Sequence, residues 1–421
     1  MMNKFNWCKN MFLQAVVIIS LLLLCACSKP IDQQEGWTKW RGPSGDGTIR
    51  DEAFNPSFIN NKDNIKWRTT VGSGYSGLCV SNNRVYTMGK KNDSGAFIDV
   101  VYCIDSKNGK IVWTYEYTLM REYPYAGPRA MPVVDGDRLF TLSADGDLTA
   151  LDVHSGEKIW DRNIPYSENL PISIYGITGS PVIEKGVIYL NIGGGIALNA
   201  DTGKTIWKGK FAPTGYATPV LLDYKGTRAV MFFTGNMLRL LNAADGKIIA
   251  SSDWINEQGI NAADPLIVED GNVLVSTSYR SDGSGMYDFS SGSFEEKWVR
   301  SGISTHFSSL IKHDELVYGI HGDTNARGRC EFTCLDPLSG EVVWSSRTSL
   351  YGSLIKVNNT IIYLNENGQL YTVEPSREGF KVSSSLNALY GRANSWVAPS
   401  YWKGHLYLRS NSGEVVCVKA I

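Results

Sequence analysis

A short recurring motif constrains the fold of this chain more than any other feature of its sequence. An Asp or Asn is followed by Gly four residues later, and that Gly is followed by Trp after four more. Successive Trp residues in the first three copies are 47 residues apart, so one unit of nearly constant length is repeated. The clear copies contain Asp105, Gly109 and Trp113; Asp152, Gly156 and Trp160; Asn199, Gly203 and Trp207; and Asp336, Gly340 and Trp344.

Each copy has the character of a tight turn between two strands. Alternating apolar residues lead to the Asp, whose side chain can bond backbone amides two residues further on. The Gly supplies the positive φ that such a turn needs, and the next strand places the Trp for packing between neighbouring sheets. A second hairpin precedes each copy, as at residues 131–142. Four strands in a unit of roughly 40 to 50 residues predict a β-propeller blade.

The two ends of the repeat region complement one another. Residues 65–71 resemble the last strand of a unit without its predecessors, and residues 413–419 resemble a third strand without a fourth. We expect the first to close the final blade, which would leave no open sheet edge. Counting first hairpins predicts an all-β, eight-bladed propeller of four-stranded antiparallel blades. Seven blades are the alternative, because residues 349–384 are weakly patterned.

The N-terminus has the features of a bacterial lipoprotein signal. Two lysines precede an apolar run, and Leu24-Cys25-Ala26-Cys27 matches the lipobox, with Cys27 as the lipidated residue. Multiple acyl chains on one cysteine would anchor the protein stably. We therefore expect residues 1–26 to be a signal peptide, 27–62 a lipidated N-terminus and linker arm, and 63–421 the propeller.

Composition excludes some function classes. Without the signal peptide, 39 Lys and Arg face 42 Asp and Glu, so no basic surplus indicates nucleic-acid binding. Five cysteines follow Cys27, an odd number that defines no complete disulfide framework. Cys330 and Cys334 could form a metal or redox pair, but buried small apolar side chains are the preferred interpretation.

These repeats resemble the PQQ-like (pyrroloquinoline-quinone) family of quinoprotein-type propellers, over nearly all of the chain from Trp37 onward. Quinoprotein alcohol dehydrogenases and the propeller lipoprotein of the outer-membrane β-barrel assembly machinery belong to this group. The opening segment, Trp37 to Gly47, is most similar to anchored or secreted members without an assigned activity. The dehydrogenases of the family use PQQ with calcium beside two adjacent cysteines, and no Cys-Cys pair follows the signal here. We predict no cofactor, with calcium and PQQ as the alternative.

Short segments rich in Gly, Ser, Ala and Pro precede the first strand of each unit. The innermost strands of a propeller begin at one mouth of its axial channel, so these segments should surround that mouth. The larger side chains of the segments could then converge on a ligand. In the alternative interpretation, the segments contain only the small residues that crowded inner strands permit. The candidate ligand-binding residues are Arg129, Tyr175, Tyr216, Asn261, His306 and Trp396.

No catalytic residue and no metal ligand is predicted, because the sequence contains no nucleophile motif and its five histidines lack ligand spacing. We expect a monomeric, membrane-anchored and periplasm-facing propeller that binds or scaffolds envelope proteins. Ser28 after the lipobox favours the outer membrane. The alternative is a PQQ-dependent or sugar-active oxidoreductase that uses the channel mouth, so the question of enzymatic activity stays open. A carbohydrate-binding module is a third hypothesis.

Overall fold

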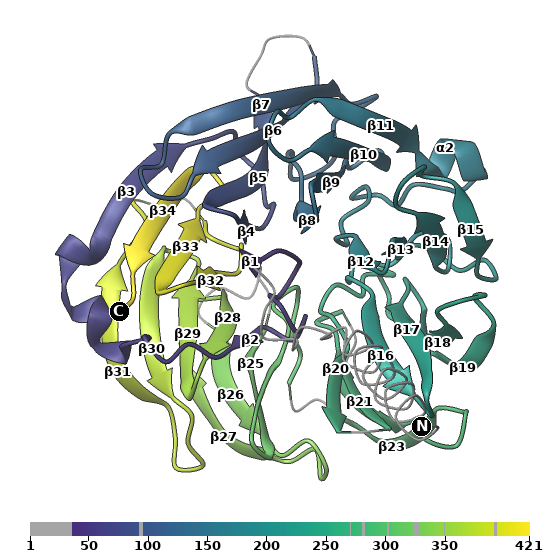
Figure 1. The fold of residues 1–421 in the computed structure, drawn as a ribbon. Coiled ribbons are helices and arrows are strands. Elements are labelled where there is room, and N and C mark those ends of the chain that lie inside the picture. The colour runs from purple at the N-terminus through teal and green to yellow at the C-terminus, as the bar shows by residue number, and fades with distance from the viewer. Residues whose placement is uncertain are drawn as a thin grey trace, which may run out of the picture. The chain divides into compact units, whose positions relative to one another are not determined.

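Eight antiparallel sheets surround a central axis (Figure 1). The computed structural model describes residues 36–91, 96–269, 271–279, 283–300, 303–322, 329–348, 350–390 and 394–421. The predicted signal peptide and Cys27 lie outside these ranges. The predicted eight-bladed propeller is confirmed, and the seven-bladed alternative is wrong. Within the part of the chain that the structure describes, every helix is too short or too polar to cross a membrane.

Blades 1 to 4 each consist of four consecutive strands, and the first strand of each lies nearest the axis (Figure 1). Blade 1 contains β4 (Cys79–Ser81), β5 (Arg84–Lys91), β6 (Ile98–Asp105) and β7 (Ile111–Thr118). Blade 2 contains β8 (Val133–Asp135), β9 (Arg138–Leu142), β10 (Asp147–Asp152) and β11 (Lys158–Asn163). After helix α2 (Ile164–Glu168), blade 3 contains β12 (Val182–Glu184), β13 (Val187–Leu190), β14 (Ile196–Asn199) and β15 (Thr205–Lys208). Blade 4 contains β16 (Val220–Tyr224), β17 (Thr227–Phe233), β18 (Met237–Asn242) and β19 (Ile248–Asp253).

Blades 5 to 7 repeat the same order. Blade 5 contains β20 (Leu266–Glu269), β21 (Asn272–Ser276), β22 (Ser284–Asp288) and β23 (Glu295–Arg300). Blade 6 contains β24 (Ile311–His313), β25 (Leu316–His321), β26 (Glu331–Leu335) and β27 (Val342–Arg347). Blade 7, the weakly patterned region, is complete, with β28 (Gly352–Val357), β29 (Thr360–Asn365), β30 (Gln369–Glu374) and β31 (Lys381–Asn387).

Blade 8 joins the two ends of the propeller. Its inner strands are β32 (Ser400–Trp402), β33 (His405–Arg409) and β34 (Glu414–Lys419), and its fourth strand is β3 (Ile65–Thr70). Antiparallel pairing places Trp67 opposite Cys417 and Arg68 opposite Val416. The predicted closure is confirmed, and it satisfies the ladder that an open final blade would expose.

In most blades the repeat motif joins one blade to the next through its Trp. A Cβ atom on Gly156 would lie 2.6 Å from the Trp113 ring, and one on Gly203 would lie 2.9 Å from the Trp160 ring. Gly is therefore required at the turn for its positive φ and for the close approach of the indole. Five Trp side chains also donate their indole N–H to a carbonyl of the following blade, at 2.8 to 3.1 Å. These donors are Trp67, Trp160, Trp207, Trp298 and Trp344.

The described part of the predicted linker arm, residues 36–62, packs on the propeller. Strand β1 (Gly36–Trp37) extends blade 1 by pairing with β4, and β2 (Thr48–Ile49) pairs in parallel with β28 of blade 7. Two short 3-10 turns, η2 (Pro56–Asn60) and η3 (Lys62–Asn64), then lead to β3. In Figure 1 this segment runs from the centre of the propeller to its rim. We call residues 36–49 the arm.

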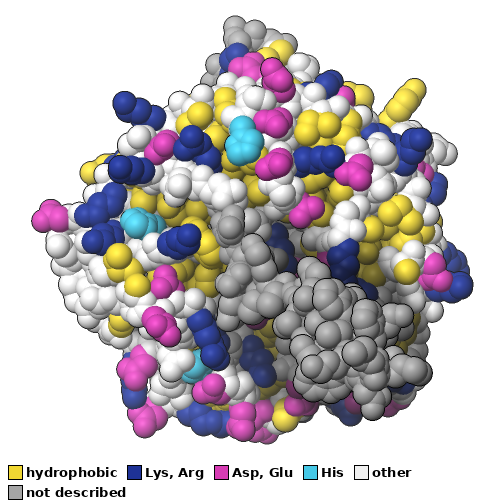
Figure 2. Space-filling view, in the orientation of Figure 1, with side chains coloured by type: hydrophobic (Ala, Val, Ile, Leu, Met, Phe, Trp, Pro, Cys, Tyr) yellow, Lys and Arg dark blue, Asp and Glu magenta, His cyan; other side chains and the backbone are white. Residues whose placement is uncertain are grey.

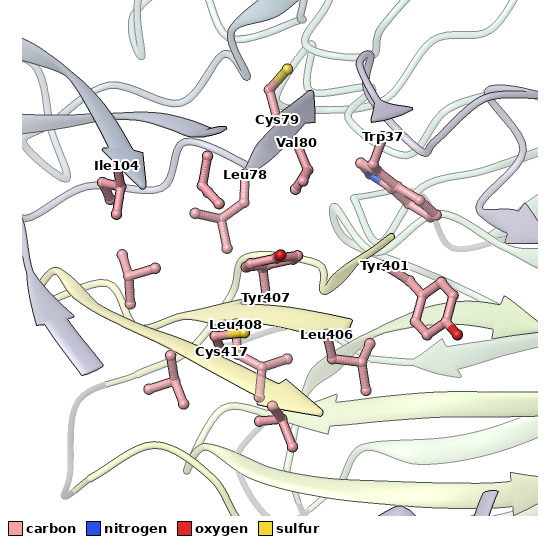
Figure 3. Packing of buried hydrophobic residues seen from close by; sticks show 14 of the residues in the cluster. Trp37, Leu78, Cys79, Val80, Ile104, Tyr401, Leu406, Tyr407, Leu408 and Cys417 are labelled. Atoms are coloured by element: carbon pink, nitrogen blue, oxygen red, sulfur yellow. The ribbon is translucent and has the colours of Figure 1, made fainter. Parts of the chain in front are cut away.

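The largest hydrophobic cluster lies where the first and last blades meet. Leu78 and Val80 of the first blade lie across from Tyr407 and Leu408 of the last, with Trp37 of the arm at the side (Figure 3). All five cysteines after residue 35 are buried, as predicted for Cys330 and Cys334. They are Cys79, Cys103, Cys330, Cys334 and Cys417.

Charged side chains of both signs are interspersed over the face of the molecule seen in Figure 2. This pattern shows no extended field of one sign on that face. It agrees with the nearly balanced composition of the chain, which has 41 Lys and Arg and 42 Asp and Glu.

Candidate functional site: the axial chamber

The segments that precede the first strand of each blade surround one mouth of the axial channel. They line a cavity of about 320 Å³, which we call the chamber. Each inner strand begins near this mouth and runs away from it. The connections between the outer strand of one blade and the inner strand of the next therefore lie on the same side of the propeller, which we call the mouth face. The volume suits a small organic ligand.

Aromatic side chains from several blades contact one another across the mouth. Trp396 stacks on Tyr75 with ring centroids 5.4 Å apart and touches Phe307 at 5.5 Å and Tyr125 at 5.9 Å. Tyr125 also contacts Tyr175. Further pairs extend the cluster to Tyr216, His306 and Tyr279. Offset and edge-to-face contacts of this kind stabilise a cluster beyond simple area burial. We call this set of rings the mouth cluster.

Arg129 holds part of the mouth cluster in place. Its guanidinium donates to the carbonyl oxygens of Tyr175 at 3.1 Å and Tyr125 at 2.7 Å, and also to that of Pro124. The same group lies 5.5 Å from the centre of the Tyr75 ring. Burial lowers the pKa of Arg129 and raises the pKa of Tyr75. Arg129 thus donates to three backbone carbonyl oxygens, and these hydrogen bonds hold the segments that carry Tyr125 and Tyr175 in place.

Two further contacts fix side chains of the mouth cluster. The indole N–H of Trp396 donates to Glu366 Oε2 at 3.3 Å. His306 Nε2 lies 2.8 Å from the Tyr279 hydroxyl, which comes from a different blade. Burial raises the pKa of Tyr216, whose ring contacts Tyr175.

Beneath the mouth, small polar side chains link neighbouring blades. The backbone N–H of Met131 donates to Ser180 Oγ at 3.0 Å, and that of Ser180 donates to Thr218 Oγ1 at 3.1 Å. The N–H of Thr218 donates to Asp264 Oδ1 at 2.8 Å, and that of Asp264 donates to Ser309 Oγ at 3.1 Å. Blades 2 to 6 are therefore joined at equivalent positions. The side-chain oxygens of these residues accept hydrogen bonds from buried backbone N–H groups, and the side chains are also small enough for the crowded inner strands.

The arm forms the floor of the chamber with Trp37, Trp40 and Arg41. The indole N–H of Trp40 donates to Asp264 Oδ2 at 2.6 Å. Asp264 is buried, and burial raises the pKa of its carboxyl group, whereas Arg41 and the hydrogen bonds from Trp40, Thr218 and Ser309 oppose that rise. The chamber is thus bounded by the arm below and the mouth cluster above.

The structure brings five of the six sequence-predicted residues to the chamber, namely Arg129, Tyr175, Tyr216, His306 and Trp396. Asn261 does not reach the cavity. It is fully buried in the connection between blades 4 and 5, where its side chain donates to the Thr234 carbonyl and accepts from Asn256. Gln258 and Ile260 line the wall there instead. Ligand binding by the five residues stays a prediction.

Sequence reasoning missed the floor and its carboxylate. Trp37, Trp40 and Arg41 were expected in a linker, although three such bulky side chains within five residues are unusual for a solvated segment. Asp264 occupies the position that Ser180 and Thr218 hold in their blades, so an acid at this point of the repeat was the available signal.

Comparison with known proteins identifies the family. A family model described as outer membrane protein assembly factor BamB matches residues 59–221 and 176–346, which is more than half of the chain. The chain belongs to this family. BamB of Moranella endobia is 22% identical over 258 residues, which are 58% of this chain and 63% of that protein.

The chain is also similar to part of a 1-butanol dehydrogenase (cytochrome c) of Thauera butanivorans. The two are 29% identical over 143 residues, which are 33% of this chain and 19% of the dehydrogenase. The chain thus spans about a fifth of the length of that relative, and less than two thirds of the Moranella endobia protein.

Solved structures share the fold at low sequence identity. BamB from Moraxella catarrhalis aligns with a TM-score of 0.59 at 14% identity, covering 84% of this chain and 100% of that one. Quinohemoprotein alcohol dehydrogenase from Comamonas testosteroni aligns with a TM-score of 0.68 at 14% identity, covering 92% and 80%. At this level of identity the likeness shows the propeller fold alone.

The chamber's side chains do not fit a calcium-bound quinone. Calcium takes six to eight oxygen ligands and prefers carboxylates. Asp264 is the one carboxylate among the described lining residues, and its oxygens already accept hydrogen bonds from Trp40, Thr218 and Ser309. Across the described ranges, no group of three His, Cys, Asp or Glu side chains could hold a metal ion. We therefore assign no chemical step to PQQ in this chamber.

Proposed function

We propose that this protein is a membrane-anchored binding or scaffolding propeller that acts in the assembly of envelope proteins. Membership in the family described as outer membrane protein assembly factor BamB is the observation that carries this proposal. The mouth-face loops supply a surface for it. Function on a propeller depends on the site rather than the fold, so the proposal needs a defined docking surface.

Exposed apolar side chains are concentrated in consecutive loops of the mouth face. Met120 is 71% exposed, Tyr166 87% and Ile174 67%, in the connections from blade 1 to blade 3. Phe211 is 56% exposed and Ile255 62%, in the next two connections. These side chains lie in loops of one face, and exposed apolar surface of this kind is typical of protein interaction sites when it is contiguous. We propose that they contact an apolar surface of an envelope protein.

The arm supports an orientation for this surface. Gly36 pairs with Ser81, the last residue of β4, so it lies at the end of that inner strand away from the mouth. Cys27 is nine residues before Gly36, a separation that spans at most about 30 Å. A lipid on Cys27 would hold the arm side of the propeller toward the membrane and leave the mouth face directed into the periplasm.

Site-specific cross-linking from the native membrane tests the docking surface. A photoreactive amino acid at Phe211 should cross-link to an envelope protein, and the second substitution Ile255→Asp should reduce the yield at least fivefold. A matched probe at Leu338 is the control. Leu338 is 61% exposed but lies in a repeat turn at the opposite end of its blade. Equal yields from the two positions, or no envelope protein at Phe211, would contradict the proposal.

The oxidoreductase alternative has one observation in its favour, the match to dehydrogenases over about a third of the chain. It predicts that the purified protein takes up PQQ with calcium, acquires quinone absorbance and reduces a dye when alcohols or sugars are added. We expect no calcium-dependent uptake, because Asp264 is the single carboxylate among the described lining residues and already accepts three hydrogen bonds. Stoichiometric uptake with dye reduction would favour the alternative over the scaffold.

A further inference from the structure

Arg41 places a buried cation at the floor of the chamber. The side chain lines the cavity although the residue is only 6% exposed. Its Nη2 donates to the carbonyl oxygens of Leu310 at 2.5 Å and Asp46 at 2.8 Å. Burial lowers the pKa of Arg41, yet a guanidinium remains protonated in proteins. The chamber therefore has a fixed positive charge on its inner wall.

No acidic side chain in the described residues forms an ion pair with Arg41. Both hydrogen bonds of its guanidinium come from Nη2, and Nη1 and Nε have no acceptor among the described residues. Asp264 is the nearest carboxylate on the chamber wall, but its oxygens are engaged by Trp40, Thr218 and Ser309. The charges of Asp264 and Asp46 offset part of the cost of burying this guanidinium, and its Nη1 and Nε donors can still bind an anion from outside the chain.

A second polar group on the same wall lacks a partner. The Ser308 hydroxyl is buried and has no hydrogen-bond partner, although the residue lines the chamber. Ser308 is two residues before Leu310, whose carbonyl oxygen binds Arg41. Arg41 and Ser308 thus both line the chamber with donors available to an oxyanion.

The backbone of the arm is bent to hold Arg41 there. Arg41 itself has φ 59°, a left-handed conformation that is unfavourable for residues other than Gly. Gly47 adds room for the side chain, since a Cβ at that position would lie 2.9 Å from Arg41 Nη2. At Gly42 a Cβ would lie 2.7 Å from the Trp37 ring. Local strain at a side chain that faces a cavity is typical of functional sites.

We propose that the chamber binds a small carboxylate with an aromatic or otherwise planar apolar body. The carboxylate pairs with Arg41 and takes a hydrogen bond from Ser308, while the planar body lies against Trp40 and the mouth cluster. The charges on the chamber wall agree with an anionic ligand, because two arginines, Arg41 and Arg129, line it with one carboxylate, Asp264. Arg–carboxylate pairs are strong where the arginine is buried, as Arg41 is. The proposal concerns the chamber and is independent of protein docking on the outer loops.

Calorimetric titration of the full-length protein tests the site without any substitution. The probes are phenylacetate and its neutral counterpart phenylacetamide, which differ only in the charged group. We expect phenylacetate to bind about tenfold or more tightly than the amide and to change tryptophan fluorescence, since Trp40 lies beside the proposed carboxylate. Equal affinities for the two probes, or no binding of phenylacetate at millimolar concentration, would overturn the proposal.

Two variants locate the binding to Arg41. In Arg41→Gln the preference for phenylacetate over phenylacetamide should disappear, and Arg41→Lys should retain part of it. Arg138→Gln is the matched control, because Arg138 is a half-buried arginine that pairs with Asp201 and does not line the chamber. An undiminished preference in Arg41→Gln, with a native circular dichroism spectrum, would contradict the assignment. Phe211→Asp should leave phenylacetate binding unchanged, which separates this site from the proposed docking surface.

Discussion

Trp40 donates its indole N–H to Asp264 Oδ2 at 2.6 Å, although 224 residues separate the two along the chain. The same carboxylate accepts the backbone N–H of Thr218 and the hydroxyl of Ser309. One buried acid therefore connects the arm with blades 4, 5 and 6. It couples the floor of the chamber to the inter-blade hydrogen bonds.

Replacing Asp264 should destabilise the whole propeller. Asp264→Ala leaves three buried donors without an acceptor, and breaking a buried charged network costs about 3–5 kcal/mol. Urea unfolding followed by circular dichroism would measure the change in the free energy of unfolding. Asp201→Ala is the control, since the Asp201 side chain is 71% exposed. Similar small losses in both variants would show that the network contributes little.

Trp67 should be important for ring closure. It lies in β3, opposite Cys417 of the last strand, and its indole N–H donates to the Ser106 carbonyl of blade 1 at 2.8 Å. Trp67→Ala should therefore lower the free energy of unfolding by about 3–5 kcal/mol. Thermal unfolding checks this, with Trp402→Ala as a control at a half-buried Trp of the same blade. If Trp402→Ala lowers the free energy of unfolding as much as Trp67→Ala does, the contacts of the Trp67 indole make no particular contribution to ring closure.

The blades and their closure could be predicted from the sequence because both depend on local, repeated chemistry. The Asp, Gly and Trp of the repeat act within one turn and on the adjacent blade, so a constant spacing reports a constant geometry. Blade 7 was harder, since Glu374 and Gly379 are poor substitutes for the motif and no Trp follows them. Its four strands form nevertheless, because β28 to β30 bury continuous or nearly continuous runs of apolar residues.

The chamber was predictable only in part. The Gly-, Ser-, Ala- and Pro-rich segments identify which loops meet at the mouth. The loops differ in length, however, so the side chain that faces the chamber is not at a constant position in each loop. Tyr175 is seven residues before its strand and Tyr216 only four, and Asn261 faces away from the cavity. The arm has no repeat counterpart, and the partners of Trp40 and Arg41, namely Asp264 and Leu310, are more than 200 residues distant. Sequence spacing therefore carried no information on where Trp40 and Arg41 would lie.

Membrane attachment through Cys27 is a separate prediction. Cys27→Ala should abolish lipid modification, so that the protein leaves the membrane fraction, because one modified residue supplies all acyl chains. Metabolic labelling with a palmitate analogue and fractionation of cells would measure both effects. Cys25→Ala, two residues earlier, is the control and should retain the label. Membrane retention of the unlabelled Cys27→Ala protein would contradict the predicted anchor.

Asp99 should make the stability of the propeller pH-dependent. Its carboxyl group is buried and has no hydrogen-bond partner, and burial raises its pKa to about 7. The folded protein then binds this proton more tightly than the unfolded chain, in which the pKa is near the ordinary value of 3.8. The stabilisation is fully present below about pH 4 and is lost as the pH rises through 7. The charged groups that act on Asp99 are Lys90, Arg129, Asp145 and Arg409.

Between pH 5 and pH 8 the free energy of unfolding should fall by about 3 kcal/mol from this group alone, because one pKa unit corresponds to about 1.4 kcal/mol. Asp99→Asn removes the titration and should flatten the dependence, leaving the variant more stable than the unmodified protein at pH 8. Urea midpoints at both pH values measure the effect. Asp137→Asn, at a side chain that is 89% exposed, is the control. Parallel pH profiles for Asp99→Asn and the unmodified protein would show that the Asp99 carboxylate is accommodated without cost in the folded state.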